Sequence, residues 1–126
     1  MRGVGKSRAD RTGLFLYEGK TLEEWLPSVV ERMVEQFDPR KVILFGSLAR
    51  GEANYDSDVD LLVVFEHMEL ENKRELAVDI SRALTGIPVP VDVIITDVGE
   101  IDRQGHIVGT VLRPALREGR VVYERS

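Results

Sequence analysis

The chain has 126 residues, a length that favours a single domain, and its 43% hydrophobic and 31% charged residues are ordinary for a globular protein. The absence of cysteine excludes disulfides and cysteine-based zinc sites, and no apolar run approaches the ~18 residues of a membrane span. The net charge is −5, although residues 1–20 carry +3 and the remainder carries −8. We therefore expect a cytoplasmic protein with neither a membrane partner nor stable binding to nucleic acid.

Residues 1–20 show no hydrophobic period and contain four glycines, which predicts a mobile N-terminal arm ahead of one domain at residues 21–126. Gly5-Lys6-Ser7 has the residue types that end a phosphate-binding P-loop. That motif also needs an upstream glycine and a preceding strand, and the chain begins too late for either. We therefore assign no nucleotide site to the arm.

The domain begins with a capping box, in which Thr21 is the N-cap and Glu24 lies three residues later. Apolar residues then follow helical spacing as far as Phe37, which predicts an amphipathic helix. Pro27 falls on its polar face and predicts a kink or a restart of the helix. A proline after Asp38 predicts that the helix ends there.

A short buried strand is predicted over residues 41–45, and Gly46 ends it because glycine turns freely and lets a ligand approach the backbone. Ser47 then has the residue type of an N-cap for a turn of helix over residues 48–50. Such a turn can bind an anion through its free N–H groups and the serine hydroxyl. It can equally be a capped helix that binds nothing.

The second strand is predicted over residues 59–65 and opens with alternating carboxylates. Because strand side chains alternate between faces, Asp58 and Asp60 point the same way, roughly 7 Å apart along the backbone, while Val59 and Leu61 face the core. Two adjacent carboxylates repel each other, and Mg²⁺ relieves that conflict because it takes one or two protein carboxylates together with phosphate oxygens. The pattern therefore predicts a magnesium site.

The remaining elements alternate between helix and strand. We predict a helix over residues 69–84, a strand over 88–96 whose prolines indicate an edge or strand-start position, a polar turn at Thr96 or Asp97, a helix over 106–118 and a short strand over 121–123.

Asp92 lies between Val91 and Val93 in the third strand. A buried, unpaired carboxylate costs several kcal/mol, so a neighbouring metal would account for its position. An exposed aspartate on an edge strand is the alternative.

Gly46-Ser47, ten further residues and then Asp58-x-Asp60 inside an apolar strand resemble the nucleotidyltransferase superfamily of the polymerase beta type, and its minimal nucleotidyltransferase branch above all. The resemblance is strong over about residues 40–65 and looser to about residue 96. It implies an α+β nucleotidyltransferase fold, with a small mixed sheet of three to four strands and helices packed mainly on one face.

The resemblance also implies the site residues. Asp58, Asp60 and Asp92 would be the catalytic carboxylates and would hold two Mg²⁺ ions, while Gly46, Ser47 and Arg50 would bind the phosphates of ATP. Arg50 has an alternative role in a structural salt bridge with Glu52 or Asp56. An acceptor oxygen would attack the α-phosphorus in line, and pyrophosphate would leave.

The resemblance finally implies a partner. Minimal nucleotidyltransferases are often paired, as antitoxins, with a small helical HEPN-type toxin, and some transfer AMP from ATP to a tyrosine of that toxin. We therefore expect a protein adenylyltransferase that acts on such a partner. Two alternatives stay open: an antitoxin that neutralises its partner by binding alone, and nucleotidyl transfer to a small molecule.

Overall fold

The computed structural model describes residues 16–54, 57–105, 110 and 112–126. Its centre is a four-stranded mixed sheet in the order β3-β2-β1-β4. Strand β1 (Lys41–Phe45) pairs antiparallel with both β2 (Val59–Phe65) and β4 (Arg120–Glu124), and β2 pairs parallel with β3 (Val91–Asp97). The predicted mixed sheet is confirmed, and β3 is an edge strand, one of the two positions that its prolines indicated.

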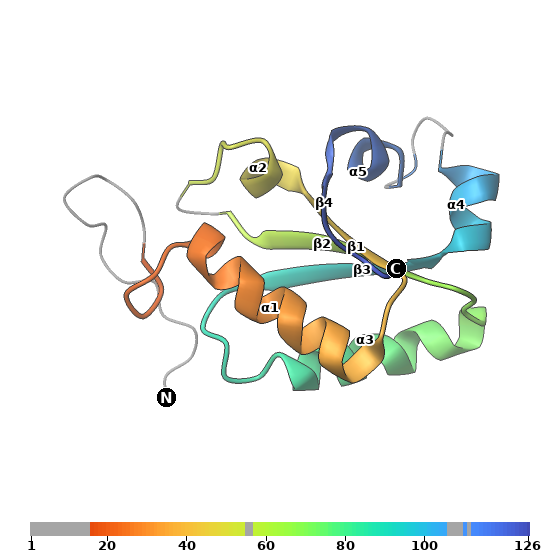
Figure 1. The fold of residues 1–126 in the computed structure, drawn as a ribbon, viewed down its shortest axis with the longest axis horizontal. Coiled ribbons are helices and arrows are strands. Elements are labelled where there is room, and N and C mark those ends of the chain that lie inside the picture. The colour runs from red at the N-terminus through yellow and green to blue at the C-terminus, as the bar shows by residue number, and fades with distance from the viewer. Residues whose placement is uncertain (1–15, 55–56, 106–109, 111) are drawn as a thin grey trace.

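Helices cover both faces of this sheet (Figure 1). The long helices α1 (Leu22–Phe37) and α3 (Lys73–Ala83) lie on one face, as predicted. The other face carries the shorter helices α4 (Val98–Gln104) and α5 (Leu112–Glu118). Each face has its own apolar cluster, because the apolar side chains of β2 alternate between the two faces.

Helix α1 begins with the predicted capping box. The Glu24 N–H donates to the Thr21 hydroxyl at 3.1 Å, and the Thr21 N–H donates to the Glu24 carboxylate at 2.8 Å. Pro27 lies exposed within α1, and the helix continues without the predicted restart. The helix ends at Asp38, whose φ of 48° is left-handed.

Residues 16–20 pack against α1, whereas the sequence predicted that they belong to a mobile arm. Tyr17 is only 1% exposed, and the Trp25 indole N–H donates to its carbonyl at 2.6 Å. The Lys20 ammonium lies 4.0 Å from the centroid of the Trp25 ring. Burial of the Tyr17 ring favours this packed arrangement. Residues 1–15 of the predicted arm lie outside the described residues.

Two predicted helices differ from the structure. The helix expected over residues 69–84 divides into a 3₁₀ turn, η1 (Leu70–Asn72), and α3. The polar turn expected after β3 begins α4, which the sequence analysis missed, and Asp97 caps this helix by accepting from the Glu100 N–H at 2.8 Å. The helix expected over 106–118 is described as α5 only from Leu112, because residues 106–109 and 111 lie outside the described residues.

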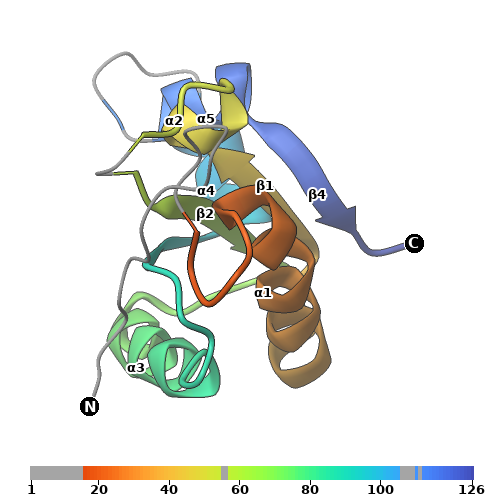
Figure 2. The same ribbon diagram turned by 90° about the vertical axis from the view of Figure 1, so that its left-hand side faces the viewer.

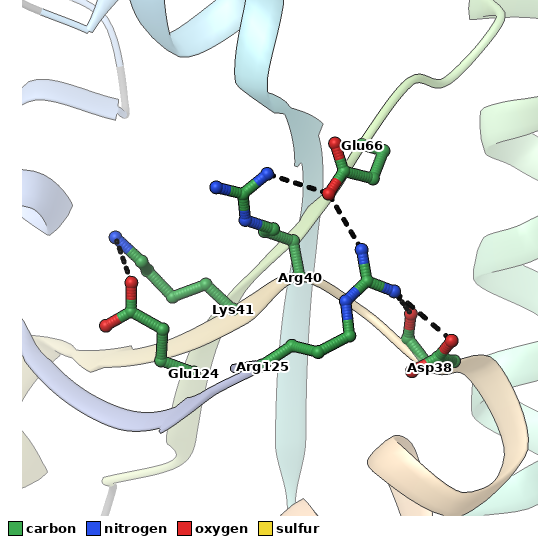
Figure 3. A network of polar contacts seen from close by, with 6 residues as sticks. All are labelled: Asp38, Arg40, Lys41, Glu66, Glu124 and Arg125. Atoms are coloured by element: carbon green, nitrogen blue, oxygen red, sulfur yellow. Dashed lines mark hydrogen bonds and ion pairs between the residues drawn. The ribbon is translucent and has the colours of Figure 1, made fainter.

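A cluster of charged side chains links the end of β4 to the neighbouring segments by ion pairs (Figure 3). The Arg125 guanidinium contacts Glu66 at 2.7 Å and Asp38 at 3.2 Å, and Arg40 reaches Glu66 at 2.7 Å. The Arg125 N–H also donates to the Arg40 carbonyl at 2.9 Å.

Within the described part of the chain, no helix is long and apolar enough to cross a membrane.

Candidate active site

Two of the three carboxylates predicted from the sequence, Asp60 and Asp92, lie on one face of the sheet. Val59 and Leu61 are fully buried in the cluster beneath α1 and α3, so Asp60 faces the opposite side, where Leu62 packs with α5. Asp92 is the register partner of Asp60 across the parallel β2–β3 pair, and residues in register share a face. The fold therefore brings together carboxylates that lie 32 positions apart in the sequence.

The environment of Asp60 disfavours its charge. Partial burial raises the pKa of the Asp60 carboxyl, and the neighbouring Asp58 and Asp92 carboxylates raise it further, while the Arg50 guanidinium partly offsets both effects. Such crowding of like charge is typical of functional sites. A bound cation would relieve it.

Asp92 adopts the alternative that the sequence left open. Its side chain is exposed rather than buried, because β3 forms the edge of the sheet. Its exposure therefore gives no reason of its own for a metal. The register with Asp60 is the observation that keeps Asp92 in the candidate site.

Gly46 is required by the carboxylate that lies beside it. Its φ is +78°, and a Cβ added at this position would collide with the Asp60 carboxylate oxygen and lie 3.1 Å from its Cγ. The antiparallel pairing of Phe45 with Asp60 produces this approach, because Gly46 directly follows Phe45. Glycine therefore lets the backbone of the turn lie against the carboxylate.

Ser47 does not cap the short helix α2 (Gly46–Ala49), contrary to the sequence prediction. Phe45 is the N-cap and makes no side-chain hydrogen bond, and Ser47 lies inside the helix. The Ser47 hydroxyl instead donates to the Ser57 hydroxyl at 2.9 Å.

Ser57 is a site residue that the sequence analysis missed. It is 6% exposed, and its hydroxyl also accepts from the Asn54 N–H at 2.7 Å. Through these two bonds Ser57 links the turn after β1 to the segment that leads into β2. Its position directly before Asp58 and ten residues after Ser47 was the available signal.

Arg50 adopts the structural alternative that the sequence left open. Its Nε donates to the Glu52 carboxylate at 2.9 Å, and a second nitrogen lies 3.8 Å from Glu118. Arg50 is exposed, and its charge nevertheless acts on Asp60. The other candidate partner, Asp56, lies outside the described residues.

The donor atoms fit a hard cation in chemical type. Within the described residues, no three His, Cys, Asp or Glu side chains converge closely enough to form a metal centre by themselves. Mg²⁺ does not need such a cage, since it commonly binds one or two carboxylates and completes its shell with phosphate oxygens and water. Asp58, Asp60 and Asp92 supply carboxylates of that kind.

Comparisons with known proteins cover the region of this site. The nucleotidyltransferase domain family matches residues 26–114. The chain is 45% identical to protein adenylyltransferase MntA of Thermococcus cleftensis over 47 residues, which are 37% of this chain and 48% of that protein. The chain thus spans about half the length of the curated relative it matches.

Two solved structures align with the chain. A proposed nucleotidyltransferase from Sulfolobus solfataricus aligns with a TM-score of 0.58 and 28% identity, over 81% of this chain and 79% of that chain. A toxin-antitoxin structure with AMP-PNP aligns with a TM-score of 0.49 and 20% identity, over 79% of this chain and 73% of that chain.

Proposed function

The chain belongs to the nucleotidyltransferase family, and from that membership we propose that it transfers AMP from ATP to a hydroxyl group of a partner protein. The observation that carries the proposal is the shared face of Asp60 and Asp92 beside the Gly46 turn. The partial match to a protein adenylyltransferase supports a protein as the acceptor. A helical HEPN-type toxin, which the family resemblance implies, is the partner that we propose, with this chain as its antitoxin.

In this proposal Asp58, Asp60 and Asp92 would hold two Mg²⁺ ions. Bound magnesium neutralises phosphate charge and favours a deprotonated acceptor oxygen. The raised pKa of Asp60 reflects first its partial burial and then repulsion from Asp58 and Asp92, and this repulsion supports a cation as their common partner.

The remaining site residues would position the reactants. The N–H groups of Gly46 and Ser47 would donate to the phosphates of ATP, and the bond from the Ser47 hydroxyl to Ser57 would hold this turn in position. Arg50 would add positive charge once it is released from Glu52. Asp92 is exposed and would accept the proton of the incoming hydroxyl group.

Transfer of label tests this proposal. The protein is incubated with Mg²⁺, ATP radiolabelled on its α-phosphate and a lysate of the source organism. Asp60→Asn serves as the inactive variant, and Asp79→Asn, which neutralises an exposed carboxylate on α3, serves as the matched control. We expect one labelled protein band with the wild type and with Asp79→Asn, and none with Asp60→Asn.

Other outcomes would redirect the proposal. Label on a small molecule rather than on a protein would replace the acceptor. If no nucleotide labels anything, although the chain still neutralises a co-expressed toxin, the chain acts as an antitoxin by contact. Equal labelling by Asp60→Asn would remove Asp60 from the site.

A further inference from the structure

An apolar groove of about 500 Å³ lies between α1 and β4. It is remote from the candidate active site, since β4 forms the edge of the sheet opposite β3, and α1 covers the face that Asp60 does not use. Figure 2 shows α1 and β4 side by side. The apolar residues that line the groove are Leu26, Pro27, Val30, Val34, Val122 and Tyr123.

The groove runs along an open backbone edge. Among the described residues, β4 pairs only with β1, so the N–H and C=O groups on its outer side have no strand beside them. An open edge flanked by an apolar groove is the geometry that accepts an added strand.

The rim of the groove is negatively charged. Glu31 and Glu35 lie one turn apart on α1, both are exposed, and no ion pair holds either of them within the described residues. The third acid on the rim, Glu23, is already paired with Arg120 at 2.9 Å. An occupant that meets Glu31 and Glu35 should therefore carry Lys or Arg.

We propose that this groove binds an extended, basic segment of a partner protein, which adds to the sheet beside β4. Two basic residues at positions i and i+2 of such a strand lie about 6.6 Å apart, close to the ~6 Å rise between Glu31 and Glu35 along α1. Apolar residues on the same face of the strand cover the floor of the groove. The proposal stands independently of nucleotidyl transfer.

A second copy of this chain fits the groove less well. Antiparallel pairing of β4 with its copy would place two α1 helices on one face, so that Glu31 and Glu35 of both chains would oppose each other. The pairing of β4 with β1 is also irregular between Val42 and Ile43, and such bulges twist an edge strand away from long, flat pairing. A short basic segment meets neither obstacle.

NMR titration with a defined peptide tests the proposal. The probe is Val-Thr-Lys-Thr-Lys-Thr-Val with blocked ends, and its control carries Glu in place of both Lys. Two further probes are N-methylated, one at all the Thr residues and the other at the Val and Lys residues. Only one of these two alternating sets of N–H groups can face β4. The proteins are the full chain, Glu31→Lys/Glu35→Lys and, with the same change in charge on η1 and α3, Glu71→Lys/Glu75→Lys.

We expect the lysine peptide to shift the amide signals of residues 120–124 in the full chain and in the Glu71/Glu75 variant. Binding should fall at least about tenfold for the glutamate peptide and for the Glu31/Glu35 variant, and for one N-methylation pattern but not the other. Thermal unfolding establishes that each variant is folded.

Three results would overturn the proposal. The first is no shift at millimolar peptide. The second is an affinity that changes neither with the charge substitutions nor with N-methylation, which would make the groove a general apolar surface. The third is self-association that moves the same β4 signals on concentration without peptide, which would assign the groove to a second copy.

Discussion

At the scale of single residues, the candidate site holds groups whose proximity is unfavourable in isolation. Asp60 lies partly buried beside two further carboxylates, and its own carboxylate occupies the space that a side chain at position 46 would need. The crowding of carboxylates weakens the fold unless a ligand uses it, whereas glycine at position 46 avoids the clash that a side chain would make. Crowding of like charge is characteristic of functional positions.

Gly46→Ala separates this local conflict from ordinary backbone strain. The left-handed φ alone should cost about 1–2 kcal/mol of unfolding free energy. The added Cβ should also displace Asp60 and abolish most transferase activity. Gly86→Ala is the matched control, because Gly86 has a φ of +96° and nothing within 4 Å of the added Cβ. Equal loss of activity in both variants, measured with unfolding curves, would contradict the role of the contact.

Ser57→Ala removes the acceptor that Ser47 and the Asn54 N–H share. Loss of one such bond is worth about 1 kcal/mol, so we expect KM for the nucleotide to rise about fivefold while kcat changes little. Ser57→Thr keeps the hydroxyl and should restore KM. In the double variant, the effects of Ser47→Ala and Ser57→Ala on KM should be less than additive, because both changes remove the same bond. Fully additive effects would show that the two serines act separately.

Sequence reasoning proposed those site residues whose pattern follows from strand geometry. Asp58 and Asp60 alternate with apolar residues, and Gly46 interrupts a buried strand, so the sequence alone is enough to find both features. The bond between Ser47 and Ser57 was not visible, because it depends on how the intervening turn folds back. The exposure of Asp92 follows from the edge position of β3, and the sequence offered it only as one of two alternatives.

At the scale of elements, the ends of helices were more predictable where a cap coincided with an apolar period. Thr21 and Glu24 open α1 as expected, with the apolar stripe of the helix following them. Asp97 and Glu100 have the same spacing at the start of α4, but Gly99 and the short apolar pattern hid the helix. The cap signature alone was therefore not sufficient to find it.

Asp97 joins α4 to the loop after β2, and its substitution tests this connection. The carboxylate accepts from the Glu100 and Met68 N–H groups, each at 2.8 Å. Asp97→Ala should lower the unfolding free energy by about 1–2 kcal/mol, measured by urea denaturation. Asp97→Asn, which has one acceptor oxygen, should keep the bond from the Glu100 N–H, lose the bond from the Met68 N–H and cost less than Asp97→Ala. Equal losses in the two variants would exclude capping as the cause.

The same residue predicts how stability depends on pH. The Glu100 N–H bond is the largest effect that lowers the pKa of Asp97, and the Met68 bond adds to it. A lowered folded-state pKa stabilises the fold above the ordinary value of about 3.9, and this contribution is lost as pH falls through the folded-state pKa. Asp97→Asn should therefore lose less stability than the wild type between about pH 5 and pH 2. Parallel pH profiles would contradict this assignment.

At the scale of the whole molecule, the candidate site and the fold place opposite demands on Asp60. Its raised pKa means that the folded state disfavours the carboxylate at neutral pH, so the charge lowers stability where the enzyme would work. Asp60→Asn should therefore raise the melting temperature by a few degrees while it abolishes transfer, as expected where stability is exchanged for activity. Asp79→Asn, which neutralises an exposed carboxylate, should leave both nearly unchanged.

Magnesium connects these two demands. A cation that binds only the folded chain stabilises it by mass action, by about 1.4 kcal/mol at a tenfold excess over its Kd. Titration with MgCl₂ should therefore raise the melting temperature of the wild type, and chelation with EDTA should reverse the rise. Asp60→Asn should not respond, because the repulsion and the ligand are both removed, whereas Asp79→Asn should respond as the wild type does. An equal rise in all three proteins would indicate a general salt effect and would place the cation elsewhere, since only a site that includes Asp60 makes the response depend on that residue.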